Sequence, residues 1–152
     1  MVTFIGIDPG AKGAVAVLDE TANVIALLDM PYDKTLKSLD IKALKDILDT
    51  YSDSFCVLEK CQYTPAIKGS GAFTFGKTIG MTETLVALSG LKHELIRPQK
   101  WQSTFSLIGK DKTSAIAVAK RLFPSVQNKL LKTKDGRADA LLIAEYCRRT
   151  MR

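Results

Sequence analysis

The chain has few cysteines, a single histidine and no long apolar segment. Three cysteines cannot all pair, and Cys56, Cys61 and Cys147 have no recognisable zinc-ligand spacing. We therefore expect neither a disulfide framework nor a zinc site. Cys56 and Cys147 are expected to be small buried residues of the core. His93 is expected to be structural or to lie at the surface, and no chemistry is assigned to it.

No apolar run approaches the roughly 18–20 residues that cross a membrane, and residues 1–4 lack the charged start of a signal peptide. We expect a cytoplasmic protein with no membrane partner. The length of 152 residues allows a sizeable core. Because no linker, repeat or low-complexity tract divides the chain, residues 1–152 are expected to form a single domain.

Positive charge is concentrated in the second part of the chain. Lys and Arg number 22 against 16 Asp and Glu, a net charge of +6. Residues 1–91 contain 8 basic and 11 acidic residues, whereas residues 92–152 contain 14 and 5. Such asymmetry is typical of a protein that binds a polyanion, most simply nucleic acid. A solvated lysine-rich surface would give the same composition.

Hydrophobic periodicity predicts a mixed α/β fold. The expected strands are 2–7, 14–18, 24–28, 55–59 and 94–96. The expected helices are 41–51, 72–89, 113–123 and 135–149, with 98–109 as a loop or irregular helix. Asp40 is expected to cap the first helix, which should turn four apolar residues to one face: Ile41, Leu44, Ile47 and Leu48. This order predicts a mixed five-stranded sheet, three antiparallel strands plus two parallel ones, with helices on both faces. It is the element order of the ribonuclease-H-like fold.

Four acidic residues are expected at the ends of these elements. Asp8 follows the first strand, Glu59 ends the fourth, and Asp135 and Asp139 begin the last helix. Strands one and four should be neighbours, which would place Asp8 beside Glu59. Asp135 and Asp139 are about 40° apart around a helix, so they share a face, on which like charges repel each other.

A bound cation would relieve that repulsion. Oxygen ligands without His or Cys are the set expected for Mg²⁺, with Mn²⁺ as a substitute. Two such ions about 3.5–4 Å apart can promote phosphodiester hydrolysis. We therefore predict a two-metal site with Asp8, Glu59, Asp135 and Asp139 as ligands. The competing interpretations are an Asx-type turn residue for Asp8 and an ordinary surface glutamate for Glu59.

One segment matches a phosphate-binding loop letter for letter, namely Gly71-Ala72-Phe73-Thr74-Phe75-Gly76-Lys77-Thr78. The confirming context, an apolar strand running directly into the first glycine, is missing. No nucleotide cofactor is therefore expected. We expect instead a helix in which Gly76 and Gly80 allow close approach of another helix or of DNA, with Lys77 as a DNA contact.

Further basic and aromatic residues are candidate nucleic-acid contacts. Lys110 and Lys112 lie at the start of a helix, where side chains and backbone amides can reach phosphates. A solvated turn is the alternative interpretation of this segment. Tyr63 and Trp101 are expected to be exposed, and either could stack on an unpaired base.

Three motifs resemble the RuvC family of Holliday-junction resolvases, and phage and organellar members are closest in pattern. They are Gly6-Ile7-Asp8-Pro9-Gly10, Val57-Leu58-Glu59-Lys60 and Asp135-Gly136-Arg137-Ala138-Asp139-Ala140-Leu141-Leu142. Two further segments resemble the basic region of that family, Arg97-Pro98-Gln99-Lys100-Trp101-Gln102 and Gly109-Lys110-Asp111-Lys112. The resemblance covers nearly the whole chain.

The resemblance implies a homodimeric, magnesium-dependent endonuclease that binds four-way DNA junctions and nicks two strands symmetrically. Such an enzyme would work in the cytoplasm, or in the cytoplasm of the host cell if a phage encodes it. By position, the resemblance implies metal ligands at Asp8, Glu59 and Asp139. It also implies a contact of Lys110 or Lys112 with the scissile region. Lys100 and Arg137 lie in segments that resemble the family, and together with Lys77 they are the remaining candidate DNA contacts.

Two positions depart from the pattern of that family. Bacterial members commonly carry the fourth acid three residues before the last one, where this chain has Gly136. Asp135, four residues before the last one, is the only candidate here. The aromatic residue that wedges into the junction is matched most nearly by Tyr63, with an offset of one position.

Three other functions fit parts of the sequence. One is a related nuclease that acts on RNA or on other branched DNA. Another is a protein that binds junctions without cutting them. The third is a nucleotide-binding enzyme that uses Lys77.

Overall fold

A computed structural model of the protein describes residues 1–62 and 64–151. Its centre is a five-stranded sheet in the order β3-β2-β1-β6-β7. The strands are β1 (Thr3–Asp8), β2 (Ala14–Asp19), β3 (Val24–Asp29), β6 (Phe55–Glu59) and β7 (Lys92–Ile96). β1, β2 and β3 pair antiparallel, whereas β6 is parallel to both β1 and β7. The predicted mixed sheet is confirmed, including the contact between the first and fourth predicted strands.

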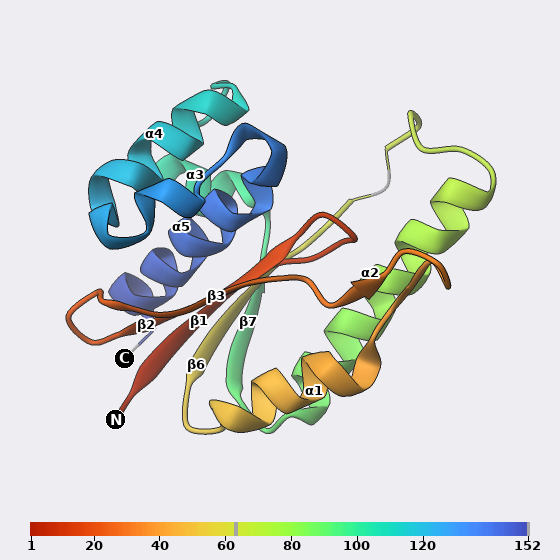
Figure 1. Ribbon diagram of the computed structural model, residues 1–152, viewed down its shortest axis with the longest axis horizontal. Helices are drawn as coiled ribbons and strands as arrows, with labels where there is room; N and C mark the ends of the chain where they lie inside the picture. Colours follow the sequence, from red (N-terminus) through yellow and green to blue (C-terminus); the bar gives the residue numbers. More distant parts are fainter. Residues whose placement is uncertain (63, 152) are drawn as a thin grey trace.

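Helices cover both faces of this sheet, as predicted (Figure 1). They are α1 (Ile41–Thr50), α2 (Ser70–Leu88), α3 (Pro98–Thr104), α4 (Lys112–Leu122) and α5 (Asp135–Thr150). Alternate side chains of a strand point to opposite faces. Phe4 and Val57 therefore join the core formed with α3, α4 and α5, whereas Ile5 and Leu58 join the core formed with α1 and α2.

The ends of two helices follow local capping chemistry. The Asp40 carboxylate accepts a hydrogen bond from the Ala43 amide at 3.0 Å, as predicted for the start of α1. Asp111 caps α4 in the same way through the amide of Ser114 at 3.1 Å. The predicted apolar face of α1 is correct for Leu44 and Leu48, which are buried, and wrong for Ile41, which is 44% exposed. Ile47 is partly buried against the same core, and Ile41 is the first residue of the helix.

Several short elements were not predicted. A hairpin forms from β4 (Tyr32–Asp33) and β5 (Ser38–Leu39), and two 3₁₀ turns, η1 (Pro124–Lys129) and η2 (Lys132–Lys134), lead into α5. Two-residue strands are too short to carry a hydrophobic period. The segment predicted as a loop or irregular helix contains the regular helix α3.

The structure also tests the predictions for the cysteines and for the phosphate-loop motif. Cys56 and Cys147 are buried, as predicted, and Cys61 is half-buried. The letters that match a phosphate loop lie within the continuous helix α2, so they form no loop around a phosphate. Within the described residues, no helix is long and apolar enough to cross a membrane.

Candidate active site

Two carboxylates lie side by side at the carboxyl edge of the parallel strand pair. β1 and β6 are in register with Ile7 opposite Leu58, so the next residues, Asp8 and Glu59, end the two strands together. Both are only partly buried, whereas Ile7 and Leu58 are fully inside the core. The sheet therefore presents two acidic groups at the edge where parallel strands commonly form sites.

Glycines bring α5 close enough to add its own carboxylates. A Cβ at Gly6 would lie 2.8 Å from Cα of Ala144 and overlap the backbone at Ala140, so α5 rests directly on β1. A Cβ at Gly136 would overlap the carbonyl of Lys12 and lie 3.1 Å from Oδ2 of Asp8. Any side chain at position 136 would therefore collide with the β1–β2 turn, and an acid at that position does not fit here.

Asp135 and Asp139 share one lysine. Nζ of Lys112, at the start of α4, lies 3.0 Å from the Asp135 carboxylate and 3.3 Å from that of Asp139. The side chain of Asp139 is only 12% exposed, and that of Asp135 is 29% exposed. The predicted common face of the two aspartates is correct, and the cation that joins them in this structure is an ammonium group.

Trp101 is part of the site, although in another way than predicted. Its indole Nε1 donates a hydrogen bond of 2.6 Å to Oε2 of Glu59. The side chain is 2% exposed, so the prediction that Trp101 is free to stack on a base is wrong. The exposed fraction is small because α3 folds as a regular helix and turns Trp101 into the core. One Glu59 oxygen is thus held by a buried donor.

The electrostatics of the site are those of crowded acids. Burial raises the pKa of Asp8 well above its ordinary value, and the neighbouring carboxylates of Asp139 and Glu59 raise it further. Burial also raises the pKa of Glu59 and of Asp139, against the Trp101 hydrogen bond and the Lys112 charge respectively. Burial lowers the pKa of Lys112, but the two aspartates outweigh that effect and raise it.

These carboxylates suit a hard divalent cation. Burial is the main cause of the raised pKa values of Asp8 and Asp139, and the neighbouring carboxylates add to it, so a bound cation would relieve their mutual repulsion. Carboxylate oxygens are the donors that Mg²⁺ and Mn²⁺ prefer. Among the described residues, no three acidic, His or Cys side chains are already arranged around a common ion position. The donor set therefore fits such an ion, with Asp8, Glu59, Asp135 and Asp139 as the residues that would hold it.

Among the described residues, the other predicted DNA contacts form no ion pair with the four acids. Lys77 is exposed on α2, and Lys110 is exposed just before α4. Lys100 pairs with Glu94 at 3.1 Å. Arg137 donates to the Asp29 carboxylate at 2.7 and 3.0 Å and to the Lys129 carbonyl, so its guanidinium ties α5 to the end of β3. Their contacts with DNA stay predictions, and Tyr63 lies outside the described residues.

Strand order could have revealed the role of Trp101. β7 is the parallel neighbour of β6, and Trp101 follows the carboxyl end of β7 by five residues. A large side chain with one polar N–H group at that edge has few carboxylate partners other than Glu59.

The sheet order, the pairing directions and the helices on both faces define a ribonuclease-H-like α/β fold, as the sequence predicts. Within that class, the chain has the fold of RuvC. It superposes on "T. thermophilus RuvC in complex with Holliday junction substrate" with a TM-score of 0.62 and 14% identity, over 95% of this chain and 90% of that one. It also superposes on a second structure, "Thermus thermophilus RuvC structure", with a TM-score of 0.62 and 15% identity, over 93% of this chain and 90% of that one. No protein-family model matches the chain, and no curated protein sequence matches it.

Proposed function

We propose that the protein is a metal-dependent endonuclease that resolves four-way DNA junctions. The observation that supports this proposal is the nearness of Asp8 to Glu59, Asp139 and Asp135, whose charges raise its pKa, on a RuvC-type fold. One structural neighbour is described as a complex with a Holliday-junction substrate, which supports branched DNA as the substrate class.

The residues divide the chemical tasks. Asp8 has acidic neighbours on both β6 and α5, so it would hold the ions together with Glu59, Asp135 and Asp139. Two Mg²⁺ or Mn²⁺ ions, when bound, would supply positive charge to the attacking and leaving oxygens. The hydrogen bond from Trp101 already restrains the Glu59 side chain, so less conformational entropy is lost when its carboxylate binds an ion. Lys112 can turn from the aspartates towards the non-bridging oxygens of the scissile phosphate.

Two symmetric cuts require two copies of the site, so we propose a homodimer. The outer face of α2 is the surface that supports this assembly. Phe73 and Leu88 on α2 are 75% and 80% exposed, and no atom lies within 4 Å of a Cβ built at Gly76 or Gly80. Glycine inside a helix costs about 1 kcal/mol relative to alanine. Close approach of a second α2 would offset that cost.

A charged residue on that face should therefore separate the two copies. We expect Phe73→Glu to fold normally, because Phe73 is exposed, and to sediment as a monomer where the wild type sediments as a dimer. Its products should change from paired nicks to single, uncoordinated nicks. The matched control is Ile25→Glu, which places the same charge on an exposed apolar residue (41%) of the edge strand β3. A monomeric wild type, or a dimeric Phe73→Glu variant, would contradict this interface.

A panel of substrates tests the proposed activity directly. The wild type is expected to place paired nicks in a synthetic four-way DNA junction with Mg²⁺ or Mn²⁺, and to bind without cutting in EDTA. Linear duplex DNA, single-stranded DNA, a three-way branch and an RNA–DNA hybrid are the comparison substrates. Faster cleavage of the hybrid or of the three-way branch would assign the chain to the related nucleases. Binding that never yields product with either ion would indicate a junction-binding protein.

A further inference from the structure

Two hollows flank the turn that follows Asp8, and neither belongs to the carboxylate cluster. The first, of about 320 Å³, lies between the β4–β5 hairpin and the start of α2. The second, of about 350 Å³, lies between that hairpin, the β1–β2 turn and η2. Ala11 and Tyr32 line both, so the two hollows meet at these residues. Lys12 and Gly13 line the second hollow, and a Cβ built at Gly136 would meet both the Lys12 carbonyl and Oδ2 of Asp8, so this hollow lies next to the candidate active site.

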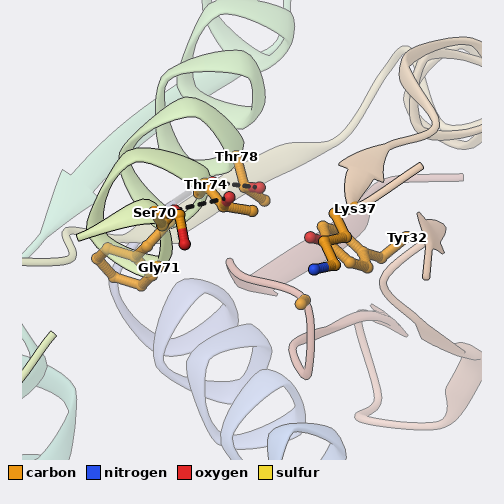
Figure 2. Close-up of a pocket in the computed structure, with 8 residues that line it drawn as sticks. Tyr32, Lys37, Ser70, Gly71, Thr74 and Thr78 are labelled. Carbon is orange, nitrogen blue, oxygen red and sulfur yellow. Dashed lines mark hydrogen bonds between the residues drawn. The ribbon is translucent and has the colours of Figure 1, made fainter. Parts of the chain in front are cut away.

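Polar side chains line one part of the first hollow, beside apolar groups such as Ala11 and Phe75. Figure 2 shows Ser70, Thr74 and Thr78 in a row on α2, facing Lys37 and Tyr32 across the gap. The Thr74 hydroxyl donates its proton to the Ser70 carbonyl at 2.9 Å. Thr74 can therefore accept a hydrogen bond from a ligand but has no proton left to donate to a phosphate. The positive group of this hollow is therefore the Lys37 ammonium.

The second hollow adds three lysines, Lys12, Lys34 and Lys134. Its one acid, Asp29, is engaged by Arg137 and, at 3.3 Å, by Lys134. In the part of the chain that the structure describes, no carboxylate lies within ion-pair distance of Lys12, Lys34 or Lys37. The lining of the joined hollows therefore carries positive charge that the protein does not neutralise.

The backbone at Lys37 gives a second sign that its side chain is used. Lys37 has a φ of 51°, in the left-handed region where glycine or asparagine costs less than lysine. The hairpin thus keeps a lysine at a position that its own conformation disfavours. The cost is offset if the ammonium group binds a ligand.

We propose that the joined hollows bind the sugar–phosphate backbone of the cleaved DNA strand on one side of the scissile phosphate. Unpaired lysines spread along an open path suit a chain of phosphates, whereas a single small ligand would be contacted by one hollow only. The proposal rests on the nuclease function proposed above and adds a positioning surface to it. It also places three DNA-binding lysines in residues 1–91, the part of the chain with more acidic than basic residues.

The test removes two charges without disturbing the fold. In Lys34→Ala/Lys37→Gly, the glycine relieves the left-handed backbone at position 37, so thermal stability is expected to match or exceed that of the wild type. Binding of a labelled four-way junction is measured in EDTA over a series of salt concentrations. The slope of log K against log[salt] should become shallower by about 0.9 for each lost phosphate contact. The matched control, Lys42→Ala/Lys45→Ala, removes two exposed lysines of α1 and should leave the slope unchanged.

A steric variant gives an independent result. Gly71 lines the first hollow, and a Cβ there meets only Cγ2 of Ile67, at 3.9 Å, so Gly71→Leu is designed to place a larger side chain into that hollow. We expect it to fold normally and to bind the junction at least threefold more weakly. If the wild type binds the junction, and both Lys34→Ala/Lys37→Gly and Gly71→Leu bind it like the control, the proposal that the hollows bind DNA is overturned. The nuclease proposal then stands. If the wild type binds no junction, the nuclease proposal fails first. Tight binding of inorganic phosphate that the double variant loses would assign the hollows to a free anion and overturn the proposal that they bind DNA.

Discussion

Asp8→Asn is expected to lose at least about a hundredfold in junction cleavage while melting at a higher temperature than the wild type in metal-free buffer. The activity falls because a neutral amide cannot bridge two cations, and the charge that bound ions supply to the transition state amounts to several kcal/mol. The stability rises because burial and the nearby Asp139 and Glu59 carboxylates disfavour the Asp8 charge. About 1 kcal/mol would raise Tm by roughly 2–4 °C in a domain of this size.

The pH dependence has a definite sign. The folded-state pKa of Asp8 is raised above its unfolded value. The protonated form therefore stabilises the fold at low pH, and that contribution is lost as the pH rises through the folded-state pKa. The Tm difference between Asp8→Asn and the wild type should be largest at neutral pH and should shrink on acidification towards about pH 4, the ordinary value of an aspartate.

Thermal unfolding by circular dichroism, with and without Mn²⁺, checks these expectations. Mn²⁺ should raise the Tm of the wild type more than that of Asp8→Asn, because an ion stabilises the state that binds it. Asp46→Asn is the control, since it changes the charge by the same amount on the exposed face of α1. A Tm for Asp8→Asn at or below that of the wild type in EDTA would refute the electrostatic argument. Undiminished cleavage would remove Asp8 from the active site.

The placement of Asp8 and Glu59 could be predicted because it depends on strand order. Three antiparallel strands followed by a helix and a fourth strand leave few sheets in which the first and fourth strands are not neighbours. Each acid follows an apolar run that marks the end of its strand. Local chemistry also sufficed for Asp40, whose side chain caps α1 through an amide three residues away.

Other parts of the site depend on contacts that the sequence does not encode locally. Trp101 is predicted to be exposed, in a loop or irregular helix, but its hydrogen bond to Glu59 crosses 42 residues. The β4–β5 hairpin consists of two-residue strands, so nothing in the sequence placed Lys37 beside α2. The choice between Asp135 and position 136 depends on the close approach of α5 to the β1–β2 turn, which is visible only in three dimensions.

Gly6→Ala is expected to destabilise the fold strongly. The new Cβ would overlap the backbone of α5 at Ala140 and Ala144, and neither main chain can rotate away as a side chain could. Overpacking in a core costs about 1–3 kcal/mol where side chains adjust. We expect about 4 kcal/mol or more here, a large share of the 5–15 kcal/mol that stabilises a typical domain.

Urea unfolding measures this loss, and Gly71→Ala is the matched control. Both changes add one methyl group and reduce the freedom of the unfolded chain equally, but a Cβ at Gly71 has only Ile67 near it, at 3.9 Å. The control should be as stable as the wild type or slightly more so. A Gly6→Ala variant that unfolds at the wild-type urea concentration would show that α5 does not rest on β1 as described. A variant that still folds should bind metal weakly, because displacement of α5 moves Asp135 and Asp139 away from Asp8 and Glu59.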